Sequence, residues 1–461
     1  MEMKYSVVIA LLAGLCATAH SQSLSENGIN KPRGEATSLA PAPDKVISRS
    51  DYIRRLQGFW LGEVIANFTG LRTEGMKKTA PFLTDEDWDT TQPIVGTDGT
   101  IKRWSKVEFV LREKGSVWNA DDDTDIEYMY QHALYQNNTS ILSPEEIREA
   151  WTDAIIVEWV TNANTGATSM KTWMLWVSND RAYRLMVNGM LPPDTSNPIN
   201  NGLYDMIDAQ LTTEVFGLFA PARPDVALKM AHLPIRTTAY QNAEWIAEFY
   251  VIMHSLASYV DPEMNMQEKT VWLAEQARNR LPESSYAAKI YDFVKLEYDK
   301  NCDKDNWEKT RDDLYERYQA QSSDGYTYKR FYDAGINFGA SLVSLFYGQG
   351  DYKRTIQIGS LCGWDSDNPT ATWGGLLGFM IGRNGVEEAF PETQLAETYK
   401  ISATRQNFPD YTPDMDGEDT FELMAERGAE IIDRVVLEEM NGGVDLVKGE
   451  WTIPDPGTKY I

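Results

Sequence analysis

Two short acidic segments, far apart in the chain, carry the residues best suited to chemistry. The first is Asp121-Asp122-Asp123-Thr124-Asp125 and the second is Asp365-Ser366-Asp367-Asn368. Each places several carboxylate or amide oxygens within four or five residues, beside apolar and aromatic flanks. Adjacent like charges repel, so a fold that brings the two segments together needs a neutralising partner. Hard oxygen ligands of this kind bind divalent cations such as Mg²⁺.

Both segments precede a predicted helix, which allows two interpretations. The helix dipole stabilises carboxylates at a helix N-terminus, so the acids could be simple capping residues. A cap needs one acid, whereas each segment supplies more, and one cation, or two roughly 3.5–4 Å apart, would neutralise them. The chain has four His and three Cys, with no CxxC or HExxH pattern, so a zinc site is not expected. Any metal would be held by oxygen atoms.

Two ladders of small residues are expected to position these segments. A helix predicted to start at Ser50-Asp51 carries a small residue at every fourth position, namely Gly58, Gly62, Ala66 and Gly70. After the second acidic segment, Asn368 suits an N-cap and Pro369 the first helical position. The same spacing then recurs in Gly374, Gly378 and Gly382. Gly inside a helix costs roughly 0.5–1 kcal/mol relative to Ala, so a ladder of it indicates close approach of another backbone. We predict that the two ladders pack against each other or against a shared neighbour.

The remaining patterns predict a mainly helical fold. Ser143-Pro144-Glu145-Glu146 combines a cap, a Pro in the first turn and a capping-box Glu. Further helices are predicted over residues 205–217, 223–232, 241–259, 266–279 and 284–299, a charged helix over 305–320 and a last amphipathic helix over 419–440. Residues 334–347 are apolar and expected to be buried. A short strand is expected near 107–111. No internal repeat or interdomain linker is visible, so residues 50–461 are predicted to form one all-α domain with a few short strands.

The composition argues against several classes of partner. The 461 residues are 42% hydrophobic and have a formal net charge of −26, from 43 Lys and Arg against 69 Asp and Glu. An acidic surface repels nucleic-acid phosphates and anionic membranes, so neither is an expected partner. The hydrophobic fraction is sufficient for a sizeable core.

The N-terminus predicts secretion. Lys4, an apolar run over residues 7–16 and the small-residue site Ala17-Thr18-Ala19 are typical of a signal peptide, here residues 1–19. The alternative is a buried first helix. Residues 20–49 are predicted to be a disordered leader, because the segment after the signal is rich in Ser, Pro, Asn and Gly. The mature chain would keep Cys302 and Cys362, either as one bridge or as two buried thiols.

Three motifs, in order along the chain, resemble the ADP-ribosylglycohydrolase family. Asp121-Asp122-Asp123-Thr124 is similar to that family's Thr-Asp-Asp-Thr motif. Gly363-Trp364-Asp365-Ser366-Asp367-Asn368 is similar to Gly-Gly-Asp-Thr-Asp-Thr, and residues 66–74 resemble Gly-Asp-x-x-Gly-x-x-x-Glu, which ends at Glu74. The similarity in character extends over residues 51–443. It implies an orthogonal multi-helix bundle.

The resemblance also implies a site and a reaction. By that resemblance two Mg²⁺ ions would be held by Asp122, Asp123, Asp365 and Asp367, with Asp121 and Asn368 in the places of family Thr ligands. The metals would grip ribose hydroxyls, orient water and support an oxocarbenium-like transition state. Glu74, Asp123 or Asp365 would be the general base.

Several residues depart from the family pattern or lie at its edge. Asn67 replaces a family Asp and begins the sequon Asn67-Phe68-Thr69, where a glycan would lie near the site. Trp364 could stack on a sugar or adenine, or pack in the core. Asn201-Gly202 faintly resembles the family's central Asn-Gly motif, so these two residues either line the pocket or belong to an ordinary loop.

These observations support one function and leave two alternatives. The first is a secreted, Mg²⁺-dependent hydrolase that cleaves a glycosidic bond and releases ADP-ribose from a modified side chain or a small acceptor. The second is a secreted glycosidase acting on another sugar or nucleoside. The third is a catalytically degenerate binding protein of the same fold. In each case the expected partner is a small-molecule or glycosyl ligand.

Overall fold

The computed structural model describes residues 43–101, 106–119, 121–162, 165–172, 175–321, 327–402, 404, 406–412 and 418–458. The predicted signal peptide, residues 1–19, lies outside these ranges, as does most of the predicted leader. Residues 43–49 of that leader are described, and they are not disordered. Lys45–Ser48 forms strand β1, which pairs with strand β8, and helix α1 starts at Arg49.

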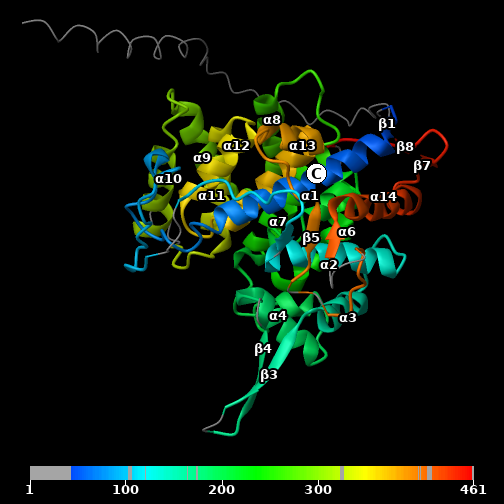
Figure 1. Ribbon diagram of the computed structural model, residues 1–461, viewed down its shortest axis with the longest axis horizontal. Helices are drawn as coiled ribbons and strands as arrows, with labels where there is room; N and C mark the ends of the chain where they lie inside the picture. The colour runs from blue at the N-terminus through cyan, green and yellow to red at the C-terminus, as the bar shows by residue number, and fades with distance from the viewer. Residues whose placement is uncertain are drawn as a thin grey trace, which may run out of the picture.

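Helices dominate the described residues (Figure 1). The α-helices are α1 Arg49–Gly70, α2 Asp122–Gln136, α3 Pro144–Ala154, α4 Val177–Val187, α5 Val215–Phe219, α6 Pro224–Thr238, α7 Asn242–Leu256, α8 Met266–Arg278, α9 Tyr286–Lys300, α10 Glu308–Tyr315, α11 Ala334–Gly348, α12 Tyr352–Cys362, α13 Asp367–Ala389 and α14 Phe421–Glu438. The all-α prediction is confirmed, and every residue of α11 is buried, which places this helix at the centre of the core.

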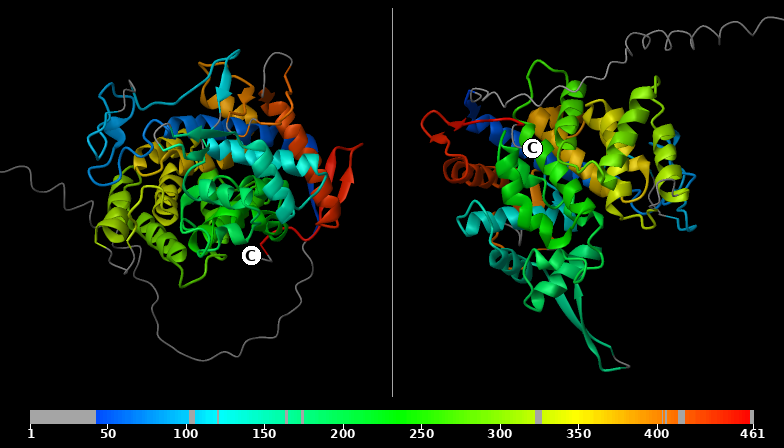
Figure 2. Two further views of the ribbon diagram at one scale, coloured as in Figure 1. Left: turned by 90° about the horizontal axis from the view of Figure 1, so that it is seen from below. Right: turned by 180° about the vertical axis from the view of Figure 1, so that it is seen from behind.

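The strands are short and lie at the periphery of the helical body. They are β1 Lys45–Ser48, β2 Val117–Asn119, β3 Val157–Thr161, β4 Thr168–Thr172, β5 Thr398–Lys400, β6 Glu418–Thr420, β7 Gly443–Asp445 and β8 Glu450–Ile453. They form two three-stranded sheets, β1-β8-β7 and β2-β5-β6, and a two-stranded hairpin, β3-β4. The hairpin, which the sequence did not predict, projects away from the helices (Figure 2).

The two small-residue ladders pack directly against each other, which is the first of the two predicted arrangements. A Cβ added to Gly62 of α1 would lie 2.4 Å from the carbonyl oxygen of Gly374 on α13, and one added to Gly378 would lie 2.3 Å from that of Gly58. Such distances leave no room for a side chain, which explains the helix-destabilising glycines. Gly382 differs from the others, because its φ of 72° marks a kink inside α13.

The crossing of α1 and α13 sets the position of both acidic segments. Gly70, at the end of α1, lies so close to the start of α13 that an added Cβ would be 2.5 Å from the Cα of Asp367. Helix α13 therefore starts beside the point where α1 ends. Figure 1 shows α1 (blue) running beside α13 (orange) across the upper part of the body.

Two predicted elements differ from the structure. Residues 205–217 contain a 3-10 turn, Ile207–Ala209, and the start of the short α5 instead of one helix. Between them, the hydroxyls of Thr212 and Thr213 donate to the carbonyls of Asp208 and Ala209. The strand expected near 107–111 is reduced to a single bridge between Val107 and Trp88. There the backbone N–H of Val110 donates to the Thr69 hydroxyl on α1 instead of to a neighbouring strand.

Other expectations were met within a few residues. The capping box of Ser143 and Glu146 starts α3, and the predicted helix at 305–320 becomes α10 followed by a π-helical turn, Glu316–Ala320. Cys362 is a free, buried thiol, which excludes a bridge between Cys302 and Cys362; Cys302 is exposed, so the alternative of two buried thiols is wrong as well. Among the described residues, none of the helices combines the length and apolar character of a membrane span.

Candidate active site

The two acidic segments meet where α2 and α13 begin. Asp121 is the residue before α2, and Asp367 is the first residue of α13. The side-chain amide of Asn368 donates to Asp123 Oδ1 at 3.4 Å, which links the two helix starts directly. Carboxylates at helix N-termini are favoured by the helix dipole, so both helices tolerate acids here. The folded chain therefore joins the two segments into one centre.

Glu74 reaches this centre from the turn that follows α1. The Thr73 hydroxyl lies 2.8 Å from that of Ser366, and Ser366 Oγ donates to the Gly70 carbonyl. The backbone N–H of Gly75 donates to the Trp364 carbonyl at 2.8 Å. These bonds fasten the turn at 70–75 to the loop before α13, so the position of Glu74 relative to Asp365 and Asp367 is fixed.

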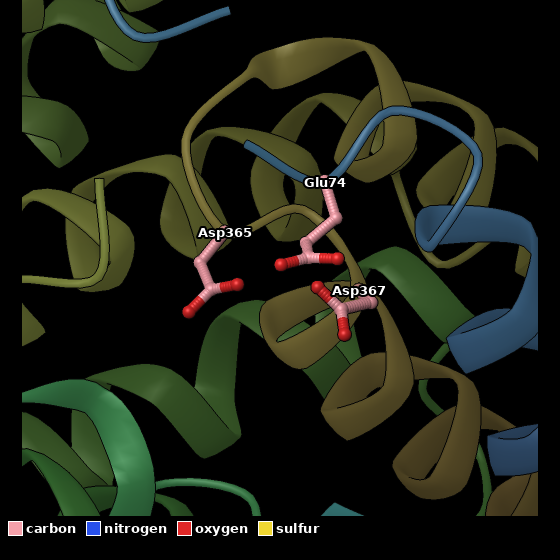
Figure 3. Close-up of side chains that lie close together, drawn as sticks. All are labelled: Glu74, Asp365 and Asp367. Atoms are coloured by element: carbon pink, nitrogen blue, oxygen red, sulfur yellow. The ribbon is translucent and has the colours of Figure 1, made fainter. Parts of the chain in front are cut away.

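Two groups of three carboxylates have oxygens within 4.8 Å of one another. One consists of Glu74, Asp365 and Asp367, and the other of Asp121, Asp123 and Asp367. Asp367 belongs to both groups. In Figure 3 the carboxyl of Glu74 lies between those of Asp365 and Asp367. The arrangement supplies convergent oxygen ligands on both sides of Asp367.

Asp123 and Asp367 are buried, the other carboxylates of the centre are half-buried, and all of them repel one another. Burial, followed by the charges of neighbouring carboxylates, holds the pKa of Asp123, Asp365 and Asp367 well above the usual range. Asp122 shows the same rise for the same reasons. Burial raises the pKa of Asp121 to about 6, and the charge of Glu74 adds to the rise. Leaving several such groups ionised without compensation is strongly unfavourable.

Several oxygens of the centre have no hydrogen-bond donor. Both carboxylate oxygens of Asp121, Oδ1 of Asp367 and Oδ1 of Asn368 are buried and unpartnered. These are hard oxygen atoms, and together with the convergent carboxylates they match the ligand preference of a divalent cation such as Mg²⁺ or Ca²⁺. The acidic centre can therefore bind a metal ion, which would offset the repulsion between the carboxylates.

The centre forms the acidic part of a cavity of about 650 Å³. Around the cavity lie further aliphatic, aromatic and charged side chains. The described residues that add to its lining outside the two acidic segments and Glu74 are Leu71, Trp176, Val177, Leu203, Ile207, Asp208, Arg330, Phe331 and Tyr332. Volume and lining suit a small ligand with ring-shaped groups.

The structure gathers most of the sequence-predicted site residues at this cavity. They are Glu74, Asp121, Asp122, Asp123, Asp365, Asp367 and Asn368. Asp122 lines the cavity but belongs to neither of the two groups of convergent oxygens. It remains a candidate ligand on the strength of the motif alone.

Trp364, Asn201 and Gly202 do not line the cavity. Trp364 is fully buried; its indole N–H donates to Gln319 Oε1 and its ring packs on Phe82, so core packing describes it. Asn201 is also fully buried, and its amide donates to the Ser178 carbonyl. Gly202 is exposed beside it. Neighbouring positions in a motif can point to opposite sides of a loop, which the sequence alone does not reveal.

Three residues that line the cavity, Trp176, Asp208 and Arg330, were not predicted from the sequence. Asp208 is 5% exposed and accepts hydrogen bonds from the Ser178 hydroxyl and the Asn179 backbone N–H. The one available signal was a carboxylate inside an otherwise apolar segment, Met206-Ile207-Asp208-Ala209. Trp176 and Arg330 carried no local signal, because their role depends on tertiary placement.

Asn67 is not a glycosylation site in this fold. Its side chain is 1% exposed and lies on α1 beside Asp121. A glycan on its amide would have no room. The sequon at Asn67 therefore does not place a glycan near the site.

A second group of acidic side chains lies deeper, outside the cavity lining. Glu63 on α1, Glu127 on α2 and Glu214 just before α5 are all fully buried, and we call them the glutamate triad. The Val215 N–H donates to Glu127 Oε1 at 3.0 Å, whereas both oxygens of Glu63 and Oε2 of Glu127 have no donor other than a neighbouring carboxyl. Glu127 lies between the other two, close enough for carboxyl–carboxyl hydrogen bonds, which require a proton on one partner.

Burial favours the protonated form of the triad. Burial, and then the mutual charge of these groups, raises the pKa of Glu63 and Glu127 well above the usual range. Burial raises that of Glu214 to about 8. A protonated carboxyl can donate as well as accept, so protons satisfy oxygens that would otherwise be unpaired.

One family model and one solved structure are similar to this chain. The ADP-ribosylglycohydrolase family model matches residues 48–421, a span that includes both acidic segments and the whole cavity lining. Among the curated proteins no match was found. A solved structure named "ADP-ribosylglycohydrolase-related protein complex" is similar at 13% identity and a TM-score of 0.44, and the match covers 83% of this chain and 98% of that chain.

Proposed function

Because the chain belongs to the ADP-ribosylglycohydrolase family, whose members hydrolyse glycosidic bonds, we propose that it is a Mg²⁺-dependent hydrolase that releases ADP-ribose from a modified side chain or a small acceptor. The observation that carries the proposal is the convergence of carboxylates from both acidic segments and Glu74 at one part of the cavity. The two groups of oxygens that share Asp367 support two ions.

In this proposal the ligands come from both segments. Asp121, Asp123 and Asp367 would hold one ion, and Glu74, Asp365 and Asp367 surround the other position. Asp122 and Asn368 complete the set from the cavity lining. When bound, Mg²⁺ supplies Lewis-acid polarisation and favours ionisation of a nearby water.

The protein's own groups orient water and stabilise charge. Glu74 and Asp365 are only partly buried, so either can contact a water in the cavity and accept its proton as general base. The concentration of negative charge around them favours the positive, oxocarbenium-like anomeric carbon of a glycosidic transition state. Asp123, at 8% exposure and facing Asn368, suits a ligand better than a base.

A second candidate function is hydrolysis of a glycoside that lacks a diphosphate. Among the described residues lining the cavity there are seven carboxylates, namely Glu74, Asp121, Asp122, Asp123, Asp208, Asp365 and Asp367, and one cation, Arg330. A diphosphate would depend on bound metal and this single guanidinium for its charge balance. An uncharged sugar would not.

The test is hydrolysis by the purified chain. ADP-ribosyl-arginine, ADP-ribosyl-serine and a panel of neutral glycans are incubated with Mg²⁺ and, separately, with a chelator. We expect Mg²⁺-dependent release of ADP-ribose, and release of a neutral sugar would support the second candidate. Metal-dependent thermal stabilisation without turnover would identify a degenerate binding protein. An Asp365→Ala, Asp367→Ala double variant with full activity would contradict the metal centre.

Secretion is proposed on the sequence alone, from the pattern of residues 1–19. Expression in a secretory host followed by N-terminal sequencing tests it. A mature protein starting close to His20, just after the Ala17-Thr18-Ala19 site, is the expected result. Retention of the intact N-terminus inside the cell would contradict it.

A further inference from the structure

The cavity carries a tryptophan that is unusually open to solvent. Trp176 lines the cavity and is 65% exposed, whereas Trp364 and Trp373 near the acidic centre are fully buried. Tryptophan normally buries most of its large apolar surface. An aromatic face left open beside a binding cavity is suited to stacking on a ring of a ligand. Core packing does not account for this side chain.

The turn that presents Trp176 is strained. Val177, the next residue, also lines the cavity and has a φ of 41°, in the left-handed region. A β-branched side chain is strongly disfavoured there. Strained backbone persists only where surrounding contacts hold it, and such strain clusters at binding sites. Some feature of the structure must therefore fix this turn.

Asp208 provides that restraint. Its carboxylate accepts from the Ser178 hydroxyl at 2.6 Å and from the Asn179 N–H at 3.2 Å. Asn201 adds a longer bond, from its amide to the Ser178 carbonyl at 3.4 Å. Asp208 is nearly fully buried, and although burial raises its pKa to about 6, the two hydrogen bonds oppose that rise because they favour the carboxylate. The 176–179 turn, which is Trp176 and the first residues of α4, is thus fastened at Ser178 and Asn179.

More rings line the cavity from another segment. Arg330, Phe331 and Tyr332 contribute to the lining, and the Tyr332 carbonyl accepts from the Ile207 N–H at 3.1 Å. This bond ties the aromatic segment to the one that carries Asp208. The cavity therefore combines a carboxylate-rich part, where the bond would be cleaved, with an aromatic part.

We propose that Trp176 is a stacking subsite for a substrate ring beyond the scissile bond, and that Asp208 is the positioning residue that holds Trp176 in place through the 176–179 turn. The inference rests on the proposed function, since that function defines which bond is cleaved. The chemistry required is a ring with a flat apolar face. A purine of an ADP-ribosyl group and a pyranose of a glycan both have one.

Equilibrium binding tests the subsite without requiring turnover. The full chain in saturating Mg²⁺ is titrated calorimetrically with ADP-ribose and, separately, with neutral hexasaccharides of glucose and xylose. For the probe that binds, we expect Trp176→Ala to weaken binding roughly 10- to 100-fold and Trp176→Phe to retain most of it. The probe that loses affinity identifies the ring as purine or pyranose.

Trp159 offers a matched control. It is 63% exposed on strand β3 and does not line the cavity, so Trp159→Ala should leave binding unchanged. Three results would overturn the stacking subsite: unchanged binding in Trp176→Ala, an equal loss in Trp159→Ala, or a wild-type chain that binds neither probe. Binding that depends on Trp176 in a chain that hydrolyses nothing would contradict the proposed function and not the subsite.

The positioning role of Asp208 is tested by a double-mutant cycle. Asp208→Asn keeps an acceptor for one of the two hydrogen bonds and should weaken binding less than Asp208→Ala does. If Asp208 acts through Trp176, then Asp208→Ala combined with Trp176→Ala should bind no more weakly than Trp176→Ala alone. Additive losses would overturn the positioning role, as would a loss of thermal stability in Asp208→Ala with unchanged affinity.

Discussion

The cavity centre and the glutamate triad are both groups of acidic side chains, and both draw on helices α1 and α2. Glu63 lies on α1, whose end leads to Glu74, and Glu127 lies on α2, whose start carries Asp122 and Asp123. The cavity centre faces a space of about 650 Å³, whereas the triad is fully buried. The two groups therefore differ in access: the cavity is open to ions, whereas the three glutamates are closed to solvent and their burial favours protonation. The same residue chemistry is thus available for binding in one place and is enclosed by packing in the other.

The largest expected effect comes from removing Asp367, which belongs to both groups of convergent oxygens. Asp367→Ala should lower kcat/KM by roughly 10³-fold or more, since even residues that only orient metal ligands contribute 10- to 100-fold. Steady-state kinetics with saturating Mg²⁺ measure it. Glu127→Gln is the matched control from the triad and should keep activity within a few-fold. Equal losses in the two variants would remove the distinction between the clusters.

Metal removal should affect stability through the cavity centre alone. Adding Mg²⁺ to about 100 times its Kd should stabilise the chelator-treated chain by about 2.7 kcal/mol, because only the folded state presents the site. Thermal unfolding with and without Mg²⁺ measures the shift in Tm. Glu127→Gln should show the wild-type shift, while Asp121→Asn and Asp123→Asn should show a reduced one. A shift lost in Glu127→Gln would mean that the triad takes part in metal binding.

Truncating the triad should cost stability rather than activity. Glu127→Ala removes the acceptor of the Val215 N–H and leaves a void between two buried carboxyls, at a cost of about 2–4 kcal/mol. Glu127→Gln mimics the protonated acid and should lie within about 1 kcal/mol of wild type near pH 6. Chemical unfolding in saturating Mg²⁺ compares the two. If the glutamine variant is as unstable as the alanine variant, the triad is not protonated.

The pH dependence should carry a smaller signature of the triad. Glu214 has a pKa of about 8 in the folded chain, against about 4.3 for an unfolded glutamate. The folded state then binds more protons, so the contribution of Glu214 is fully present below about pH 4.3 and is lost as pH rises through about 8. Groups facing it include Glu127 and Thr372. Unfolding measured from pH 5 to 9 in saturating Mg²⁺ should show a shallower decline for Glu214→Gln than for wild type; parallel curves would contradict the assignment.

The two clusters also differ in how far the sequence reveals them. Adjacent aspartates such as Asp122 and Asp123 conflict with ordinary surface. The small-residue ladders at 58–70 and 374–382 predicted close helix packing, either against each other or against a shared neighbour, and the structure shows the first arrangement. Glu63, Glu127 and Glu214 stand singly among unremarkable neighbours, so no local pattern marks their burial. The same limit applies to the cavity wall: Asn201-Gly202 drew attention by its motif, whereas Asp208 lines the cavity. Contacts between distant segments decide these cases.

Direct counting of bound metal tests the central claim, that the cavity centre takes divalent cations and the glutamate triad does not. Equilibrium dialysis against Mn²⁺, a spectroscopically visible substitute for Mg²⁺, gives the number of ions per chain. We expect two bound ions per chain for the wild type and for Glu127→Gln, and a loss of binding in Asp367→Asn. Undiminished binding in Asp367→Asn, or a loss confined to Glu127→Gln, would contradict it.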